Sequence, residues 1–251
     1  MAARLPDFLG IGTQKGGTTS LQALLEQHPG AYLPPAKELH YFSLHADRGP
    51  GWYAEQFAPA GPQQRCGEIT PYYLFHPQAP ARIQALLPEV RLIVLLRDPV
   101  ERALSQYFHA RRHGFEPLEL EAALAAEAGR LAGAEAQLEA AGSRHTSHQK
   151  HSYVSRSRYE QQLAVYEQRF GAAQLLVIRS EDLFSSTERC WQSIQTFLGL
   201  EPIPLPAPLA RANAGRGEAN AVPAAIRQQL RQELAATAQA VQARYGFDWG
   251  W

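Results

Sequence analysis

Short apolar runs alternate with stretches of helical periodicity along this chain. Residues 8–12 and 91–96 are strand-like runs that are apolar except for Arg91, and each precedes a segment in which apolar residues recur every three or four positions, at 18–27 and 100–113. Strands that are apolar on both faces and are joined by helices are typical of a covered parallel sheet. The pattern therefore predicts a three-layer α/β fold, with a central parallel sheet flanked by helices.

Further segments extend the predicted architecture. An apolar run at 175–178 follows an amphipathic segment at 159–170, and residues 67–70 supply another short strand. Residues 118–141 are rich in Ala, Glu and Leu, which favours helical structure. Because polar residues there outnumber the apolar stripe, we expect this helix to lie exposed on the surface.

The last part of the chain predicts a loop followed by a helix. Residues 199–208 are dense in proline and residues 211–220 are polar and contain glycine, so we expect an extended loop that is able to cover a ligand. The last helix is predicted near 223–245. No linker divides the 251 residues, so we expect a single domain over 1–251.

Composition narrows the classes of partner. The chain has 24 basic and 24 acidic residues, so no overall field attracts nucleic acid or an anionic membrane, and any anion site must be local. Two cysteines, Cys66 and Cys190, are too few for a disulfide framework, so we expect buried thiols in a reducing compartment. The start of the chain lacks a signal-peptide core, and no run approaches the roughly 20 apolar residues of a membrane span. We therefore expect a cytoplasmic protein.

The segment 8–20 carries the strongest chemical signal. It reads Phe-Leu-Gly-Ile-Gly-Thr-Gln-Lys-Gly-Gly-Thr-Thr-Ser, an apolar strand that turns through glycines into a helix start rich in hydroxyl groups. Such a turn directs unpaired backbone N–H groups and the positive end of a helix dipole at one spot, which suits phosphate or sulfate oxygens. The alternative is a turn that needs its glycines for tight geometry alone. The order Lys-Gly-Gly-Thr-Thr-Ser after a strand favours an anion-binding, P-loop-like turn.

The turn differs from an ATP-binding Walker A loop, G-x-x-x-x-G-K-[ST]. When Gly12 and Gly17 are aligned with the glycines of that motif, Thr18 stands at the lysine position and Thr19 follows it. The lysine lies inside the loop, at Lys15. This displacement argues against an ordinary magnesium–ATP site.

A second phosphate contact is predicted beyond residues 91–96. Arg97 and Asp98 follow that strand directly, at the edge where parallel sheets bind ligands, and Ser105 lies about two turns further along the next helix. The arginine fork and the hydroxyl suit a phosphate. The alternative is a structural Arg97–Asp98 pair with a serine on a polar helix face. Since Asp98 lies beyond Arg97 rather than at the strand end, no metal site is indicated.

An acid and an imidazole lie close together at Glu38 and His40. If the segment is extended, both side chains project to one side, about 7 Å apart at the backbone. A glutamate near Lys37 and partly shielded by aromatic residues is a credible general base, with the histidine orienting substrate or sharing the proton. The alternative is an exposed loop in which Glu38 pairs with Lys37.

Five motifs in this order resemble the 3′-phosphoadenylyl-sulfate-dependent sulfotransferases, especially the branch that includes the heparan sulfate sulfotransferases. The resemblance covers most of the chain and rests on residues 14–19, 37–42, 51–53, 67–73 and 96–107. It implies 3′-phosphoadenylyl sulfate (PAPS) as donor and transfer of a sulfuryl group to a hydroxyl, in preference to an amine.

The resemblance also implies roles for single residues. Glu38 is implied as the catalytic base, with His40 beside it in the acceptor site. Arg97 and Ser105 are implied to bind the 3′-phosphate. A Lys-Gly-Arg motif near the family's end corresponds to Ala214-Gly215-Arg216 here, which makes Arg216 a candidate cofactor contact. The 5′-phosphosulfate is assigned to the loop and its backbone, which comprise Lys15, Gly16, Gly17, Thr18, Thr19 and Ser20.

Departures from the family pattern concern the acceptor. Ile69 stands where the heparan sulfate enzymes carry lysine in Glu-Lys-Thr-Pro, and Ser43 replaces their aspartate. We therefore expect a smaller or less charged acceptor, such as a small molecule or a carbohydrate or lipid metabolite. Nearby aromatic residues either line the acceptor site or form core; they are Tyr41, Phe42, Trp52, Tyr53, Tyr72 and Tyr73.

Two other functions stay open at this point. One is a P-loop kinase or NTPase, which the threonine at the Walker lysine position disfavours. The other is a non-catalytic protein that binds the desulfonated product, 3′,5′-bisphosphorylated adenosine (PAP), and presents residues 118–141 to a partner.

Overall fold

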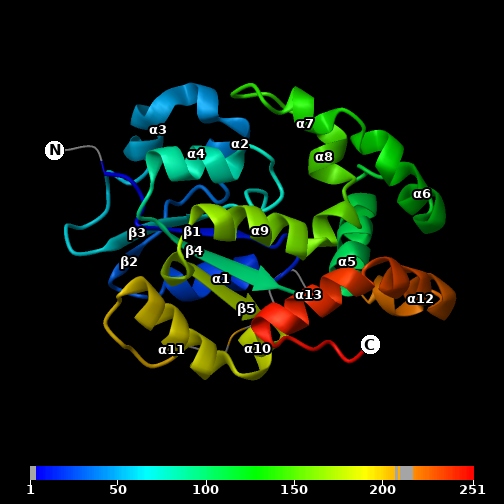
Figure 1. The fold of residues 1–251 in the computed structure, drawn as a ribbon. Helices are drawn as coiled ribbons and strands as arrows, with labels where there is room; N and C mark the ends of the chain where they lie inside the picture. Colours follow the sequence, from blue (N-terminus) through cyan, green and yellow to red (C-terminus); the bar gives the residue numbers. More distant parts are fainter. Residues whose placement is uncertain (1–3, 207–208, 210–216) are drawn as a thin grey trace.

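A five-stranded, entirely parallel sheet forms the centre of the computed structural model, which describes residues 4–206, 209 and 217–251 (Figure 1). The strand order is β2-β3-β1-β4-β5. The strands are β1 (Phe8–Gly12), β2 (Ala31–Tyr32), β3 (Arg65–Ile69), β4 (Arg91–Leu96) and β5 (Leu175–Arg179). The predicted α/β fold class is confirmed; the two-residue edge strand β2 has no predicted counterpart.

The helices follow the strands in the alternation that the sequence predicts. The α-helices are α1 (Thr18–Leu25), α2 (Tyr41–Leu44), α3 (Gly49–Glu55), α4 (Ala79–Leu86), α5 (Pro99–Arg112), α6 (Leu120–Leu131), α7 (Ala134–Gln137), α8 (Thr146–Lys150), α9 (Tyr159–Arg169), α10 (Ser180–Ser185), α11 (Thr187–Leu198), α12 (Ala224–Glu233) and α13 (Ala235–Tyr245). Short 3₁₀-helices are η1 (Ala46–Arg48), η2 (Ser155–Ser157), η3 (Ala172–Gln174) and η4 (Glu218–Ala221).

Both faces of the sheet are covered because successive strand residues point to opposite sides. Leu9 and Leu92 pack on one face with side chains of α2, α4 and α9. Phe8 and Ile93 pack on the other face with side chains of α1 and α11. Figure 1 shows this sandwich, with α4 and α9 on one side of the strands and α11 on the other. A third apolar cluster joins α5, α6 and α12 beside the sheet.

The topology brings three strand ends together at one edge. Strand β1 lies between β3 and β4, with Gly10 paired to Ile69 on one side and Ile93 on the other. The chain leaves β1 toward α1, leaves β3 at Thr70 and leaves β4 at Arg97. In open α/β sheets, ligands bind outside the carboxyl ends of strands where the connections diverge. This edge is therefore where the candidate residues gather.

The segment predicted as an exposed helix, 118–141, is largely helical and exposed, but it forms two helices instead of one. The helix breaks between α6 and α7, where Gly133 adopts a left-handed backbone with φ 74°. The segment is also partly buried, because the Glu127 carboxylate accepts hydrogen bonds from the backbone N–H groups of Val154 and Ser155, at 2.8 Å each. Glu127 therefore points into the protein, where it satisfies backbone N–H groups that lie 27 and 28 residues further along the chain. Local composition does not reveal such a contact.

The predicted last helix is also divided. Helices α12 and α13 meet at Leu234, whose side chain is buried in the third cluster. Part of the predicted covering loop, residues 207–208 and 210–216 with Arg216 among them, lies outside the described residues. Cys66 and Cys190 are buried free thiols, as predicted. Within the described ranges, no helix combines the length and apolar character needed to cross a bilayer.

Two glycines provide a matched test of the packing. A Cβ at Gly67 would lie 2.2 Å from the Phe8 ring, so Gly67→Ala forces the core apart and should cost about 1–3 kcal/mol of unfolding free energy. Gly129 lies within α6, and a Cβ added there would meet open space, so Gly129→Ala should raise stability by about 0.5–1 kcal/mol. Urea unfolding midpoints measure both; equal effects would contradict this packing.

Candidate active site

The turn after β1 is held tightly against β4. The backbone N–H of Thr13 donates to the Leu95 carbonyl at 3.0 Å, and the N–H of Gly16 donates to the Thr13 carbonyl at 2.9 Å. A Cβ at Gly16 would lie 2.7 Å from the Leu95 carbonyl oxygen, and Gly17 adopts φ 99°. Gly16 is therefore required because the Leu95 carbonyl approaches it closely, and Gly17 because its backbone is left-handed.

Helix α1 begins directly after this turn. Gly17 is its N-cap and provides no side chain to satisfy the first N–H groups of the helix, which point along the axis toward the turn. Thr18 and Ser20 are buried side chains. The Thr19 hydroxyl accepts a hydrogen bond from the Lys37 ammonium. This hydrogen bond links the start of α1 to the segment that carries Glu38.

Positive charge gathers around Lys15. Partial burial lowers the pKa of its ammonium to about 8, and the neighbouring charges of Arg112, Arg97 and Lys37 contribute to that lowering. The residue adopts φ 72° within the turn. Four cations around one loop form a site for a ligand with several negative charges.

Arg112 is a member of this cluster that the motifs do not single out. It lies in the last turn of α5 and pairs with Glu218 at 2.8 Å. It follows Ser105 by seven residues, or about two helical turns, so helical spacing is the signal in the sequence that points to it.

Arg97 reaches the turn from the end of β4. Its guanidinium donates to the Lys15 carbonyl at 3.3 Å. Asp98 instead caps α5, accepting from the N–H groups of Val100 at 2.8 Å and Glu101 at 3.0 Å. Among the described residues, the ion pair between Arg97 and Asp98 that the structural alternative predicted does not form. Ser105 lies half-buried on α5.

Glu38 and His40 meet, although by a different geometry from the expected one. The Glu38 Oε2 atom lies 3.5 Å from His40 Nε2. The segment is not extended, because Glu38 and His40 adopt φ 57° and φ 54°. The left-handed turn at His40 starts α2, and the N–H groups of Ser43 and Leu44 in that helix donate to the His40 carbonyl. The extended arrangement was therefore wrong, while the predicted proximity is present.

The surroundings keep Glu38 in its basic form. Burial raises the pKa of its carboxyl, but the hydrogen bond and charge of His40, with the charges of Lys37 and Lys150, outweigh burial and give a net lowering of the pKa. Because the Lys37 ammonium bonds to Thr19, the described structure does not contain the alternative Glu38–Lys37 surface pair. Lys150 comes from α8, which the sequence did not connect with this site.

A buried hydrogen-bond network supports His40. Its backbone N–H donates to the Thr70 hydroxyl at 3.3 Å, and that hydroxyl donates to Glu68 Oε2 at 2.6 Å. Glu68 Oε1 accepts from the hydroxyls of Tyr53 at 2.8 Å and Tyr73 at 2.6 Å. The network thus connects Thr70, which follows β3, to the segment that carries Glu38 and His40.

Most of the candidate aromatic wall belongs to the core. The buried members are Tyr41, Phe42, Tyr53, Tyr72 and Tyr73, and Trp52 is half-buried. Ser43, the departure from the family aspartate, places its hydroxyl 3.0 Å from His40 Nδ1. Ile69, the other departure, is buried against Gly10 in the sheet. Of these two positions, only Ser43 contacts the candidate acid–imidazole pair.

Arg156, a buried arginine, forms hydrogen bonds with the turn after β1 and with α8. The Arg156 guanidinium lies 5.1 Å from the Tyr72 ring centre and 4.9 Å from that of Phe75. It donates to the Gln14 side chain within the turn and to the His148 carbonyl, the latter at 2.8 Å. Arg156 thus connects the turn to the segment that carries Lys150.

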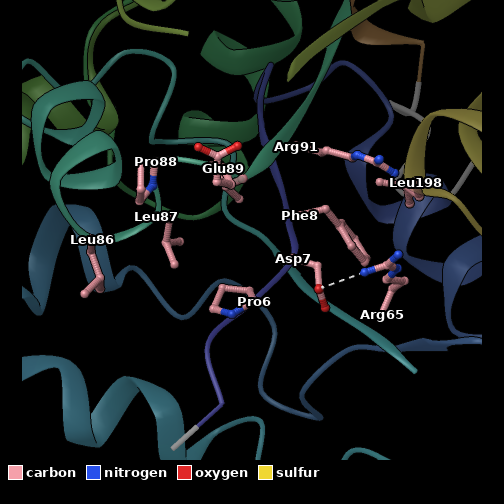
Figure 2. A pocket seen from close by; sticks show the side chains of 11 residues that line it. Pro6, Asp7, Phe8, Arg65, Leu86, Leu87, Pro88, Glu89, Arg91 and Leu198 are labelled. Carbon is pink, nitrogen blue, oxygen red and sulfur yellow. Dashed lines mark hydrogen bonds and ion pairs between the residues drawn. The ribbon is translucent and has the colours of Figure 1, made fainter. Parts of the chain in front are cut away.

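A pocket of about 400 Å³ opens at the opposite edge of the sheet (Figure 2). Its lining includes Phe8, Arg65 and Arg91, which begin or lie at the amino ends of three strands. Figure 2 shows Asp7 paired with Arg65, at 3.3 Å. Because the turn, Arg97 and Thr70 lie at the carboxyl ends, this pocket is separate from the candidate active site. Within the described part of the chain, no three His, Cys, Asp or Glu side chains gather as a metal site.

Comparison with known proteins identifies the class that this fold and turn define. Residues 5–206 match the sulfotransferase domain family, so the chain belongs to that family. A sulfotransferase from Alicyclobacillus acidocaldarius superposes with a TM-score of 0.79 at 25% identity, covering 98% of this chain and 97% of that one. Mouse sulfotransferase SULT7A1 complexed with PAP shares the fold, with a TM-score of 0.58 at 14% identity over 98% and 90% of the two chains.

Curated relatives match a shorter part of the chain. The membrane-associated sulfotransferase kil1 of Dictyostelium discoideum is 42% identical over 122 residues, 46% of this chain and 26% of that protein. The human heparan sulfate glucosamine 3-O-sulfotransferase 3B1 is 40% identical over 104 residues, 41% of this chain and 26% of that protein. The matched segments span about a quarter of these relatives' length. The predicted resemblance to the heparan sulfate branch is confirmed, while the cytoplasmic location stays a prediction.

The charge cluster predicts a measurable change at Lys15. Arg112→Ala removes a neighbouring positive charge, so the pKa of the Lys15 ammonium should rise from about 8 toward its usual value of 10.5. Amine labelling of Lys15 as a function of pH, read by mass spectrometry, gives this pKa. Arg244→Ala, which breaks an exposed pair with Glu167, is the control and should leave the Lys15 titration unchanged. An unshifted titration in Arg112→Ala would show that the two charges do not interact.

Proposed function

We propose that this chain transfers a sulfuryl group from PAPS to a hydroxyl group of an acceptor, in preference to an amine, and that residues 1–251 act as one sulfotransferase domain. One observation carries the proposal. Lys37 bonds to Thr19 at the start of α1, and the next residue is Glu38, so the acid–imidazole pair lies beside the anion-binding turn. A carboxylate base next to a cationic phosphate site suits transfer to a hydroxyl.

The residues present fit a bisphosphorylated nucleotide. We assign the 5′-phosphosulfate to Lys15 and to the backbone of residues 16–20, and the 3′-phosphate to Arg97 and Ser105. Arg112 adds positive charge beside Lys15. Arg216 stays a proposed cofactor contact. The family membership and the PAP complex of a protein with the same fold support this assignment.

The proposed chemistry divides between the base and the cations. When bound, PAPS supplies the sulfuryl group and a phosphate leaving group. Glu38 accepts the hydroxyl proton as the acceptor oxygen bonds to sulfur, and His40 holds the Glu38 carboxylate in place. As the bond from sulfur to the bridging oxygen breaks, its electron pair stays on the phosphate, where Lys15 and the turn N–H groups stabilise the developing charge.

The acceptor is proposed only by class. We expect a small molecule, a carbohydrate or a lipid metabolite, because the lysine of the heparan sulfate branch is replaced by Ile69 and that side chain is buried in the sheet. We also propose that transfer needs no metal ion, since Lys15 and Arg97 supply the positive charge that Mg²⁺ supplies in P-loop NTPases.

Separate substitutions should separate chemistry from donor binding. Glu38→Gln removes the base and should lower kcat by about 10²- to 10⁴-fold with nearly unchanged PAP affinity. Arg97→Ala removes a charged phosphate contact and should weaken PAP binding by about 10- to 100-fold. Calorimetry measures the affinity for PAP. Turnover is measured by the transfer of labelled sulfate from PAPS to metabolites of a cell extract, which are identified by mass. Arg65→Ala, at the opposite pocket, is the matched control. Equal loss of PAP binding in Glu38→Gln and Arg97→Ala would contradict these roles.

Donor binding should take up a proton near pH 8. The ammonium of free Lys15 has a pKa of about 8, and a bound phosphate favours its charged form. Binding of PAP should therefore be strongest below pH 8 and weaken as pH rises through that value. Calorimetry at pH 8 in two buffers with different ionisation enthalpies should show uptake of up to about half a proton. Lys15→Ala should abolish that uptake. If the unmodified protein and the variant took up the same number of protons, Lys15 would not contact the donor.

A further inference from the structure

Two tryptophans after α13 donate hydrogen bonds to acids next to Arg97. The Trp251 indole N–H donates to Asp98 Oδ2 at 2.6 Å, and the Trp249 indole N–H donates to Glu181 Oε2 at 3.2 Å. Figure 1 shows this red segment leaving α13 close to α10, the helix that carries Glu181. Gly250 lies between the tryptophans with φ 75°, which lets both rings turn toward the sheet edge.

The remaining oxygens of both acids are also occupied. Asp98 Oδ1 accepts the two N–H groups that start α5. Glu181 Oε1 accepts the backbone N–H of Asp98 at 3.0 Å. Each carboxylate therefore uses one oxygen for the backbone beside Arg97 and the other for an indole, and Glu181 Oε2 also lies 3.5 Å from Arg179 Nε in an ion pair.

The backbone of Arg97 is fixed from both sides. Its carbonyl accepts a hydrogen bond from the Tyr159 hydroxyl at 2.9 Å. The next backbone N–H along the chain, that of Asp98, donates to Glu181 Oε1. The Trp249 and Tyr159 rings lie 6.5 Å apart between centres. With the main chain held in this way, the guanidinium is directed to the Lys15 carbonyl.

The indoles also prevent competition for Arg97. Two carboxylates close to a guanidinium would ordinarily form ion pairs with it, and a paired arginine binds a phosphate less well. Among the described residues, Arg97 forms no ion pair with either acid. The indole donors bind these carboxylates without adding charge, and the cation that pairs with Glu181 is Arg179 rather than Arg97, which leaves the positive charge of Arg97 for a ligand.

We propose that Trp249 and Trp251 are positioning residues for donor binding. They hold Glu181 and Asp98 away from the Arg97 guanidinium and keep that guanidinium directed at the turn after β1. This inference rests on the proposed function, in which Arg97 binds the 3′-phosphate of the donor.

The test removes one N–H donor and keeps an aromatic ring. Trp251→Phe and Trp249→Phe should each raise the Kd for PAP, measured by calorimetry, by about three- to tenfold. Trp191→Phe is the matched control, because it removes an indole bond to the Ile203 carbonyl, a contact between α11 and the segment that follows it, and it should leave the Kd unchanged. Thermal unfolding of each variant reports whether a Kd change comes with loss of the fold.

A double-mutant cycle separates positioning from general destabilisation. In an Arg97→Ala background, Trp251→Phe should have no further effect on the Kd for PAP, because the indole acts through Arg97. An equal loss in both backgrounds, or an unchanged Kd in both single variants, would overturn the inference. Failure of the unmodified protein to bind PAP would instead overturn the proposed function. If Trp251→Phe unfolds, Trp249→Phe in the same cycle decides the question.

Discussion

The concentration of positive charge on the turn after β1 is the constraint on which the rest of the site depends. Backbone N–H groups at the start of α1 point into a region that already holds Lys15, Arg97 and Lys37, and the lowered pKa of the Lys15 ammonium reflects both its burial and that crowding. An anionic ligand removes the repulsion and replaces it with attraction. The positions of the cations in the folded protein would therefore contribute part of the free energy of binding the proposed donor.

That charge persists because the nearby acids have partners of their own. Glu38 contacts His40, Glu68 accepts three hydroxyl donors, and Asp98 and Glu181 accept backbone and indole N–H groups. Most of these donors are neutral, so they hold the carboxylates without cancelling the cations. The arrangement keeps the proposed base and the proposed phosphate-binding cations close together without joining them as salt bridges, which both the proposed transfer and the proposed role of the tryptophans require.

The parallel sheet separates this chemistry from the other edge of the molecule. All strands point the same way, so the turn, Thr70 and Arg97 meet at the carboxyl ends, while the pocket beside Arg65 lies at the amino ends. The same topology explains why residues far apart in sequence share the site. Arg156 reaches Gln14 across the edge, and Lys150 acts on Glu38 from α8.

The amino-acid sequence by itself determined four of the five strands, the glycine turn, the proximity of Glu38 to His40 and the family, because apolar periodicity, glycine conformation and motif order are local properties. Tertiary structure decided that Arg112 lies beside Lys15, that Ile69 is buried in the sheet, and that α6 ends before Gly133. Most of these features depend on contacts between segments tens of residues apart. Burial and charge at such contacts are set by which chain segments meet in space, and no local pattern encodes that meeting.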